Sequence, residues 1–278
     1  MYHNESIVIA TKHGKEKVIA KHFESEFEVN CFVEKTYDTD LFGTFSGEVA
    51  RTLSPVDTLR AKCLQAMEHY GYNFGIANEG SFGPHPGLFF IPADEELMIY
   101  IDKLNEIEVI VKHISTHTNF NGKIIKDENE LDVFLNQVYF PSHYVILRKS
   151  KEENECIIKD INNYKELLLN FQKMKNLYNE VYIETDMRAM HNPMRLLVIE
   201  EATLKLIEAI KSKCPKCKTP GFIPTKLKPG LPCKFCGLPT KSIKLEVYKC
   251  KKCSYEYEKM YPKNKQVEDP QFCDYCNP

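Results

Sequence analysis

The sequence predicts a mixed α/β domain over residues 1–210, with a central sheet and helices on both faces, followed by a small cysteine-rich domain over residues 211–278. Three observations support this prediction. Short apolar runs alternate with amphipathic segments through the first 210 residues, which is the pattern of α/β proteins. The chain has 278 residues, which is long for a single hydrophobic core. Eight of its 11 cysteines lie beyond residue 210.

The elements of the first domain follow from local patterns. Ser54-Pro55 and Asn192-Pro193 each offer an N-cap residue followed by a proline at the first helical position. Helices are expected at residues 14–23, 55–70, 128–138, 163–178 and 193–211. Strands are expected at residues 6–10, 27–33, 74–78, 144–148 and 181–184, with a hairpin over 97–102 and 106–114.

The net charge of −2 conceals two oppositely charged parts. Residues 211–278 contain 15 Lys and 6 Asp or Glu, a balance of +9, so residues 1–210 carry −11. This difference indicates two units with different partners. The N-terminus lacks the apolar core of a signal peptide, and the sequence contains no apolar run of 18 residues, so we expect a cytoplasmic protein.

The cysteines of the tail form four C-x-x-C pairs, which indicate metal binding in a chain without a secretion signal. Four thiolates make one closed tetrahedral zinc site, so we expect a zinc-ribbon domain with two structural four-cysteine sites that hold zinc, or iron in its place. The metal would supply folding energy that a lysine-rich tail cannot obtain from apolar burial. The ligands would be Cys214, Cys217, Cys233, Cys236, Cys250, Cys253, Cys273 and Cys276.

Two pairings of the four turns are open. Sequential pairing joins the first turn to the second and the third to the fourth. Nested pairing joins the two middle turns and the two outer turns, and it is slightly favoured because residues 243–248 resemble a strand that runs into the third turn. The basic tail either presents a solvated lysine face or docks on nucleic acid or a partner protein.

Ligands of α/β proteins bind beyond the carboxyl ends of the strands, so the residues directly after each expected strand are candidates for a binding site. The first strand is followed by Thr11, Lys12, His13, Gly14 and Lys15 at the start of a helix. Lysines and the amide groups of a helix N-terminus both favour anions, which makes this turn a candidate phosphate site. The alternative is a solvated, lysine-rich start of a helix.

The later strand ends supply acids, hydroxyls and histidines. The segment Gly75–Gly87 is predicted to leave its strand at Asn78 as a Gly/Pro-rich loop that carries Glu79, and Glu184 and Asp186 end another strand. Paired carboxylates at a strand end can hold a divalent cation. The other candidates are Asp40, Arg51, Ser81, His85 and Arg188, which follow strands, and His143, which stands at the start of one.

This combination of residues favours a pocket for a phosphorylated small molecule and Mg²⁺. The metal would bridge carboxylates and phosphate oxygens, while lysine would neutralise the remaining charge. Glu79 and Asp40 would hold the metal or activate water, with help from Asp186, and His85 or His143 would contact a base or act as an acid. The sequence has no Walker lysine motif, no G-x-G-x-x-G and no nucleophile elbow.

The chain resembles an uncharacterised bacterial family along nearly its full length. The resemblance rests on the segments IATKHGKEKVIA, DTDLFGTFSGE, NEGSFGPHP, PADEE, HISTHTNF, ETDMRA and NPMR, and on the terminal C-x-x-C pairs. It implies a domain of unknown function with a C-terminal double zinc ribbon, and it implies no specific activity.

The first 100 residues or so are also similar to the inosine-triphosphatase and Maf group of nucleotide pyrophosphatases. The similar parts are the turn with Ala10, Thr11 and Lys15, the partial match at residues 60–62, and the acidic Gly-rich segment 75–80. The resemblance implies that the first turn and Lys62 bind phosphate and that Glu79 binds Mg²⁺ or acts as a base. His13 stands where asparagine is usual in that group, and the group has no zinc tail.

Two functions are therefore expected in different classes. The first is a Mg²⁺-dependent hydrolase, such as a nucleotide pyrophosphatase, that acts on a nucleotide or another phosphorylated small molecule. The second is a non-catalytic nucleotide-sensing module whose zinc ribbon docks on nucleic acid or a protein partner.

Overall fold

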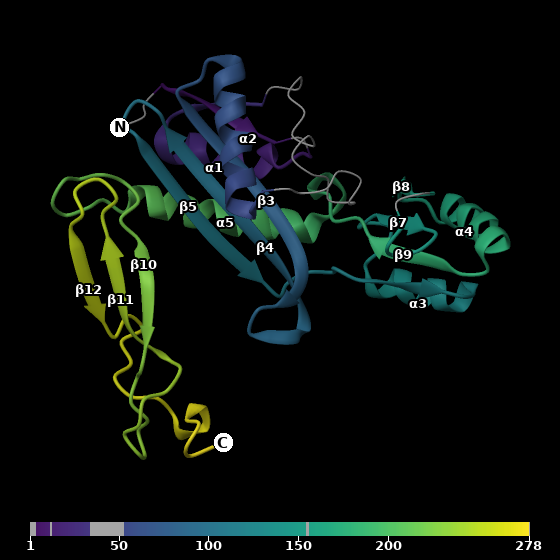
Figure 1. The fold of residues 1–278 in the computed structure, drawn as a ribbon. Helices are drawn as coiled ribbons and strands as arrows, with labels where there is room; N and C mark the ends of the chain where they lie inside the picture. The colour runs from purple at the N-terminus through teal and green to yellow at the C-terminus, as the bar shows by residue number, and fades with distance from the viewer. Residues whose placement is uncertain (1–3, 12, 34–52, 154–155, 278) are drawn as a thin grey trace. The chain divides into compact units, whose positions relative to one another are not determined.

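The computed structural model of the protein describes residues 4–11, 13–33, 53–153 and 156–277. The chain divides into two compact units, residues 1–207 and 208–278, and the boundary falls within helix α5 (Pro193–Lys211) (Figure 1). The first unit contains a five-stranded and a four-stranded sheet, and the second contains a three-stranded sheet. The expectation of one central sheet is therefore wrong, although the mixed α/β class is correct.

The five-stranded sheet has the order β2-β1-β3-β4-β5. Strand β1 pairs in parallel with β2 and β3, whereas β4 pairs antiparallel with β3 and β5. The parallel pairs require crossovers, which are helices α1 and α2. The bounds of these elements are β1 (Ser6–Ala10), α1 (Glu16–Phe27), β2 (Asn30–Phe32), α2 (Pro55–Tyr70), β3 (Phe74–His85), β4 (Leu88–Asp102) and β5 (Ile107–Ser115).

Helices cover both faces of this sheet (Figure 1). On one face, α2 packs through Leu59, Cys63 and Met67 against β1, β3 and β4. On the opposite face, the ring of Phe23 from α1 stacks with that of Tyr100 at 6.4 Å between centroids. Helix α5 reaches the same face, since Thr203 contacts Met98. Side chains of alternate strand residues therefore enter two separate cores.

The Gly/Pro-rich segment Gly75–Gly87 is a strand and a tight turn rather than a loop. Strand β3 continues from Phe74 to His85, and every residue from Glu79 to Pro84 pairs with a residue of β4. Only Pro86 and Gly87 lie between the two strands. The expectation of a loop from Glu79 onward is wrong because cross-strand pairing satisfies the backbone despite the glycines and prolines.

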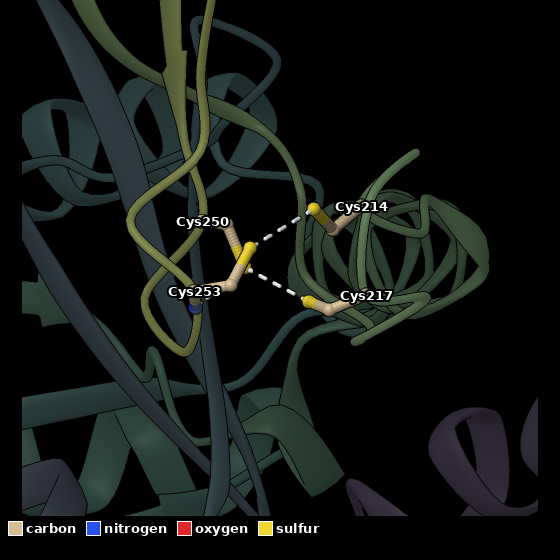
Figure 2. A group of neighbouring side chains, drawn as sticks. All are labelled: Cys214, Cys217, Cys250 and Cys253. Atoms are coloured by element: carbon tan, nitrogen blue, oxygen red, sulfur yellow. Dashed lines mark hydrogen bonds between the residues drawn. The ribbon is translucent and has the colours of Figure 1, made fainter.

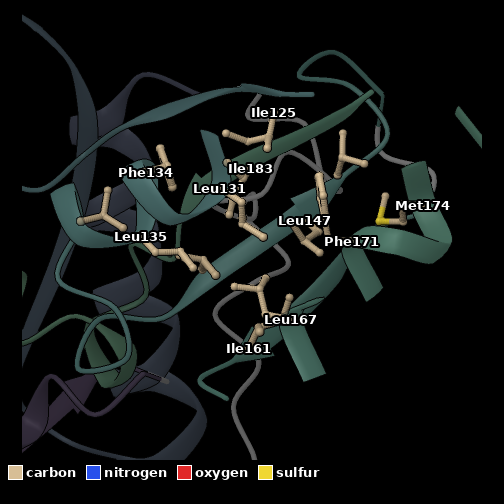
Figure 3. Close-up of a cluster of buried hydrophobic side chains, with 13 residues drawn as sticks. Ile125, Leu131, Phe134, Leu135, Leu147, Ile161, Leu167, Phe171, Met174 and Ile183 are labelled. Atoms are coloured by element: carbon tan, nitrogen blue, oxygen red, sulfur yellow. The ribbon is translucent and has the colours of Figure 1, made fainter. Parts of the chain in front are cut away.

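The four-stranded sheet has the order β6-β9-β7-β8, with antiparallel pairing throughout. Its core is a cluster that includes Phe134, Phe171 and Ile183, shown in Figure 3. Asn163 caps α4 by accepting hydrogen bonds from the amides of Lys165 and Glu166. The elements are β6 (Gly122–Ile125), α3 (Glu128–Gln137), β7 (Val145–Arg148), β8 (Ile158–Ile161), α4 (Tyr164–Tyr178) and β9 (Val181–Thr185).

The second unit is an antiparallel ribbon of β10 (Pro224–Pro229), β11 (Ile243–Lys249) and β12 (Glu256–Met260). A cysteine tetrad lies at each end of the ribbon. Four cysteines come from the segment before β10 and the turn between β11 and β12, which meet at one end. The other four come from the segment between β10 and β11 and the segment after β12, which meet at the opposite end. Across both units, the helices of the described residues are too short or too polar to cross a lipid bilayer.

Candidate functional site

Buried charged residues gather where β3 and β4 extend beyond the carboxyl end of β1. Strand β1 ends at Ala10, whose register partner is Ala77, and the next residues of β3 are Asn78 and Glu79. We call this group the sheet-edge cluster. Its members are less than a tenth exposed and come from several elements and turns: Lys15, Lys62, Asn78, Glu79, Asp94, Glu96 and Arg195.

The turn between β1 and α1 places Lys15 over the edge of β3. Gly14 has a φ of 77°, a left-handed conformation that glycine adopts without strain and that lets the chain reverse before α1. The Lys15 ammonium donates to the carbonyl oxygen of Asn78 at 3.3 Å. Burial, followed by the charge of Arg195, lowers the pKa of Lys15 to about 8. Near it in sequence, the buried Thr11 hydroxyl has no hydrogen-bond partner among the described residues.

Glu79 forms an ion pair with Lys62, which lies on helix α2. The Lys62 ammonium lies 2.6 Å from Glu79 Oε2, and both side chains are less than a tenth exposed. Strand alternation directs Glu79 to the face that α2 covers, opposite to the face of Asn78. Glu79 also raises the pKa of Lys15, after the larger effect of Glu96, so its charge acts on the β1 turn.

The other face of the edge carries a second buried ion pair. Arg195, on α5, donates from Nε to Glu96 Oε1 at 2.8 Å, and Asn78 donates from Nδ2 to Glu96 Oε2 at 2.9 Å. Burial opposes the ionisation of Glu96, but Arg195 and Lys15 outweigh it and hold the pKa of this carboxyl below its usual value. Arg195 also lies 4.9 Å from the centroid of the Phe82 ring.

Gly80 makes room for this second ion pair. A Cβ atom at residue 80 would lie 2.2 Å from Nη2 of Arg195 and 2.7 Å from Oε1 of Glu96. No real Cβ contact is that short, so a side chain at this position would displace the guanidinium. The glycine is thus required by the close approach of Arg195, rather than by the turn that its sequence context suggested.

Asp94 is the third acid of the cluster. Its side chain is completely buried, and Glu96 is the side chain of the cluster that offers it a hydrogen bond. Burial, followed by the charge of Glu96, raises the pKa of Asp94 to about 8. Asp94 is therefore protonated at neutral pH, and it offers a carboxylic acid instead of a negative charge.

With Asp94 neutral, the cluster holds three cations and two anions. The cations are Lys15, Lys62 and Arg195, and the anions are Glu79 and Glu96, so one positive charge is in excess. An arrangement of this kind attracts an anion with several oxygen atoms, such as a phosphate group. The carboxylates are oxygen ligands of the type that Mg²⁺ prefers.

The structure brings Thr11, Lys15, Lys62 and Glu79 to this edge, and all four are candidates from the sequence. His13 lies in the same turn and is half-buried. Ser81 follows on β3 beyond Glu79 and is also half-buried. Lys12, Asp40 and Arg51 are candidates that lie outside the described residues.

The two histidine candidates have structural contacts elsewhere. His85 Nδ1 accepts hydrogen bonds from the amides of Gly87 and Leu88, which shape the tip of the β3-β4 hairpin. His143 Nε2 accepts from the amide of Met194 at 3.3 Å, in the first turn of α5. Burial lowers the pKa of His143, which favours the neutral imidazole that this acceptor role requires.

Asp186 and Arg188 belong to a separate group at the end of β9. Arg188 donates to both oxygens of Asp186 and to Asp160 Oδ1, and His191 also contacts Asp160 at 2.9 Å. Asp160, Asp186 and His191 have donor atoms within 4.8 Å of one another, which is close enough for a metal ion. Arg188 already forms ion pairs with both carboxylates, so this group is better described as an ion-pair network.

Sequence reasoning did not select Asp94 or Glu96, and it assigned Arg195 no specific role. Asp94 and Glu96 lie on the same face of β4 as the buried Met98 and Tyr100. The signal that could have found them is an acidic pair at alternate positions beside the apolar run Leu97–Ile101, because acids on a buried strand face need partners.

The eight tail cysteines form two tetrads. Cys214, Cys217, Cys250 and Cys253 make the first, with Sγ–Sγ contacts of 3.5 and 3.7 Å (Figure 2). The second has contacts of 3.6 and 3.9 Å, between Cys236 and Cys273 and between Cys233 and Cys276. Zinc–sulfur bonds of ~2.3 Å in a tetrahedron place the sulfurs about 3.8 Å apart. Both tetrads could therefore hold zinc.

The pairing of the turns is interleaved. The first C-x-x-C turn joins the third, and the second joins the fourth, so both the sequential and the nested pairing are wrong. The reason is the three-stranded ribbon. Strand β10 carries the chain from one end to the other, β11 returns it and β12 carries it back, so alternate turns meet at the same end.

A family model described as "Domain of unknown function (DUF6671)" matches residues 62–278. No functionally curated protein shows significant sequence similarity to the chain. Among solved structures, protein VC0702 from Vibrio cholerae is a distant neighbour with 10% sequence identity and a TM-score of 0.33. The match covers 75% of this chain and 96% of that protein.

Proposed function

We propose that this chain, which belongs to the DUF6671 family, is a Mg²⁺-dependent hydrolase that acts on a nucleotide or another phosphorylated small molecule bound at the sheet-edge cluster. One observation carries the proposal. Within the part of the chain that the structure describes, the buried Lys15 ammonium donates to one backbone carbonyl, and the buried Thr11 hydroxyl of the same turn has no hydrogen-bond partner. An ammonium has three donors, so the turn retains capacity for an anionic oxygen.

The electrostatics of the cluster favour phosphate as that anion. Burial disfavours the charge of Lys15 in the free protein, and a bound phosphate would compensate for it. Lys62 and Arg195 add two further cations near the same edge, while Asp94 is protonated and contributes no opposing charge. Helix α1 starts directly after Lys15, so its N-terminal amides would add a favourable dipole.

Glu79 is the proposed group for chemistry. A phosphate that drew Lys62 toward its oxygens would weaken the ion pair with Glu79, and Glu79 would then accept a proton from the attacking water or bind Mg²⁺. The metal would supply neutralisation of the charge on the phosphate oxygens. Asp40 is a proposed second ligand, whereas Asp186 belongs to the separate ion-pair network with Arg188.

A specific observation also supports the non-catalytic alternative. Both ionised carboxylates of the cluster are already paired with a cation, Glu79 with Lys62 and Glu96 with Arg195. If phosphate binding leaves these pairs intact, the described cluster offers no base to activate water. The α/β domain would then sense a nucleotide, and the zinc ribbon would engage a partner.

The test combines binding and turnover with the full-length, zinc-loaded protein. Pyrophosphate and the common nucleoside triphosphates are titrated calorimetrically with and without Mg²⁺, and phosphate and pyrophosphate release is measured in parallel. Lys15→Met should weaken binding at least about tenfold, because it removes a charge-assisted contact. Glu79→Gln should retain binding and lose turnover.

Two matched variants serve as controls. Lys17→Met removes an exposed lysine from the same helix, and Glu95→Gln neutralises an acid that pairs with Lys112 on the adjacent strand. Both should behave as the parent protein. Equal binding by the Lys15→Met and Lys17→Met variants would refute the phosphate site. Binding without turnover, for all substrates and with Mg²⁺ present, would refute the hydrolase and leave the sensing module.

A further inference from the structure

The two turns of the cysteine tetrad that follows β10 and β12 carry exposed aromatic rings. Phe235 is 83% exposed and Tyr275 is 72% exposed, although each lies inside a C-x-x-C turn, in CKFC and CDYC respectively. Phe272, which immediately precedes Cys273, is 58% exposed. Because the two turns meet at one tetrad, the rings belong to the same end of the ribbon.

Metal binding does not explain these rings. The two turns of the other tetrad read CPKC and CKKC, with Lys216 and Lys252 at the position that Phe235 and Tyr275 occupy. Those lysines are exposed as well, so this position points outward in both tetrads and its side chain is not needed to hold the metal. Large exposed rings at such a position are therefore typical of a surface that binds a ligand, because a ligand that covers them removes their apolar area from water.

The charge of the ribbon specifies the kind of ligand. Residues 211–278 contain 15 lysines, and all except the half-buried Lys244 are exposed. With 6 acids the balance is +9, and two zinc–thiolate sites at −2 each would leave +5. Lysine is depleted in protein–protein interfaces, so a lysine-rich surface with a few exposed rings fits a polyanion better than a protein.

We propose that this end of the ribbon binds single-stranded nucleic acid. Phe235, Tyr275 and Phe272 would stack on unpaired bases, and the surrounding lysines would contact phosphates. The absence of arginine from residues 211–278 argues against reading base edges in a duplex groove. The proposal therefore predicts binding that tolerates sequence and prefers unpaired strands. It does not depend on the function proposed for the α/β domain.

The experiment uses full-length, zinc-loaded protein and fluorescence anisotropy. The probes are labelled oligouridylate and oligothymidylate that exceed one site of about 4–16 nucleotides, with a duplex of equal length for comparison. The double variant Phe235→Ala/Tyr275→Ala should weaken single-strand binding by ~5- to 150-fold for each stacked base. Its salt dependence should stay unchanged, because no phosphate contact is lost.

A second pair of variants tests the lysines. Lys234→Gln/Lys263→Gln should flatten the plot of log affinity against log salt concentration by about 1.4, the value for two phosphate contacts on a single strand. The control is Phe89→Ala/Phe90→Ala, which removes two rings of matched exposure, 82% and 73%, from the β3-β4 hairpin. This control should bind as the parent does.

Each outcome bears on the proposal. Retention of two zinc ions per chain shows that a variant has kept its folded ribbon, so a loss of binding then reports the removed side chains. Equal weakening by the two aromatic double variants would overturn the proposal. So would duplex binding as tight as single-strand binding, or affinity that does not change with salt.

Discussion

Arg195 and Glu96 lie 99 residues apart in the sequence and form a buried ion pair, with 2.8 Å between Nε and Oε1. The pair joins helix α5 to the long β3-β4 hairpin. Asn78 completes the coordination of Glu96 from the adjacent strand, and Arg195 Nη1 donates to the carbonyl oxygen of Met187 at 2.5 Å. The sheet-edge cluster is thus held by contacts between distant parts of the chain.

Removal of Arg195 should destabilise the first unit strongly. Arg195→Met keeps the length of the side chain but leaves Glu96 buried without its main counter-charge, a change that costs about 3–5 kcal/mol in comparable cases. Thermal unfolding followed by circular dichroism should show a melting temperature lower by many degrees. The matched control is Arg60→Met, which breaks the half-exposed pair with Glu108 at 2.7 Å. That change should cost about 1 kcal/mol or less, and a similar loss in both variants would contradict the assigned burial.

Gly80→Ala should be poorly tolerated for steric reasons alone. The new methyl group would meet Nη2 of Arg195 at 2.2 Å, and overpacking of this kind costs about 1–3 kcal/mol. Gly83→Ala, on the same strand, meets no atom within 4 Å and should leave the melting temperature nearly unchanged. Equal melting temperatures for the two variants would show that Arg195 does not pack against Gly80 as described.

Asp94 should make the stability of the first unit depend on pH. Its pKa is about 8 in the folded protein and 3.8 in the reference state, so between these values the folded protein holds a proton that the unfolded chain has lost. The free energy of unfolding therefore falls as pH rises from about 4 to 8. The charges that face Asp94 are Glu96, Arg195 and Lys15.

Asp94→Asn keeps the neutral shape and removes this titration. The melting temperatures of parent and variant should be similar at pH 5, and the variant should become the more stable one toward pH 8, by on the order of 2–5 kcal/mol. Circular dichroism melts at half-unit pH steps would measure the difference. A gap that stays constant across this range would show that Asp94 is ionised throughout.

Much of the secondary structure could be predicted from the sequence because local signals agree with the final contacts. Ser54 caps α2 by accepting a hydrogen bond from the amide of Asp57, and the predicted helix begins at the next residue. Strands β6 and β8 could not be predicted in this way. Each has only two apolar residues among four, whereas β7 of the same length contains the apolar run Val145–Leu147, and their pairing with β9 and β7 depends on tertiary contacts that no local pattern records.

The candidate site shows the same division between local and distant information. Lys15 and Glu79 could be selected because each follows a short apolar run near a glycine. Glu96 and Arg195 could not be assigned a partner, since an acid within a strand and an arginine at a helix start are usually exposed. Only the fold shows that they are buried and neutralise each other.

The interleaved tetrads can be tested by counting zinc. Cys217→Ser/Cys253→Ser alters two ligands of one tetrad, so this variant should retain one zinc ion per chain. Cys217→Ser/Cys236→Ser alters both tetrads and should retain none. Sequential pairing predicts the reverse result, and nested pairing predicts the loss of both ions from either variant. Mass spectrometry of the metal content after removal of loosely bound zinc would distinguish the three arrangements.

Because metal binding supplies folding energy to small domains of this kind, the variant without zinc should also lose the ordered ribbon, which limited proteolysis would detect.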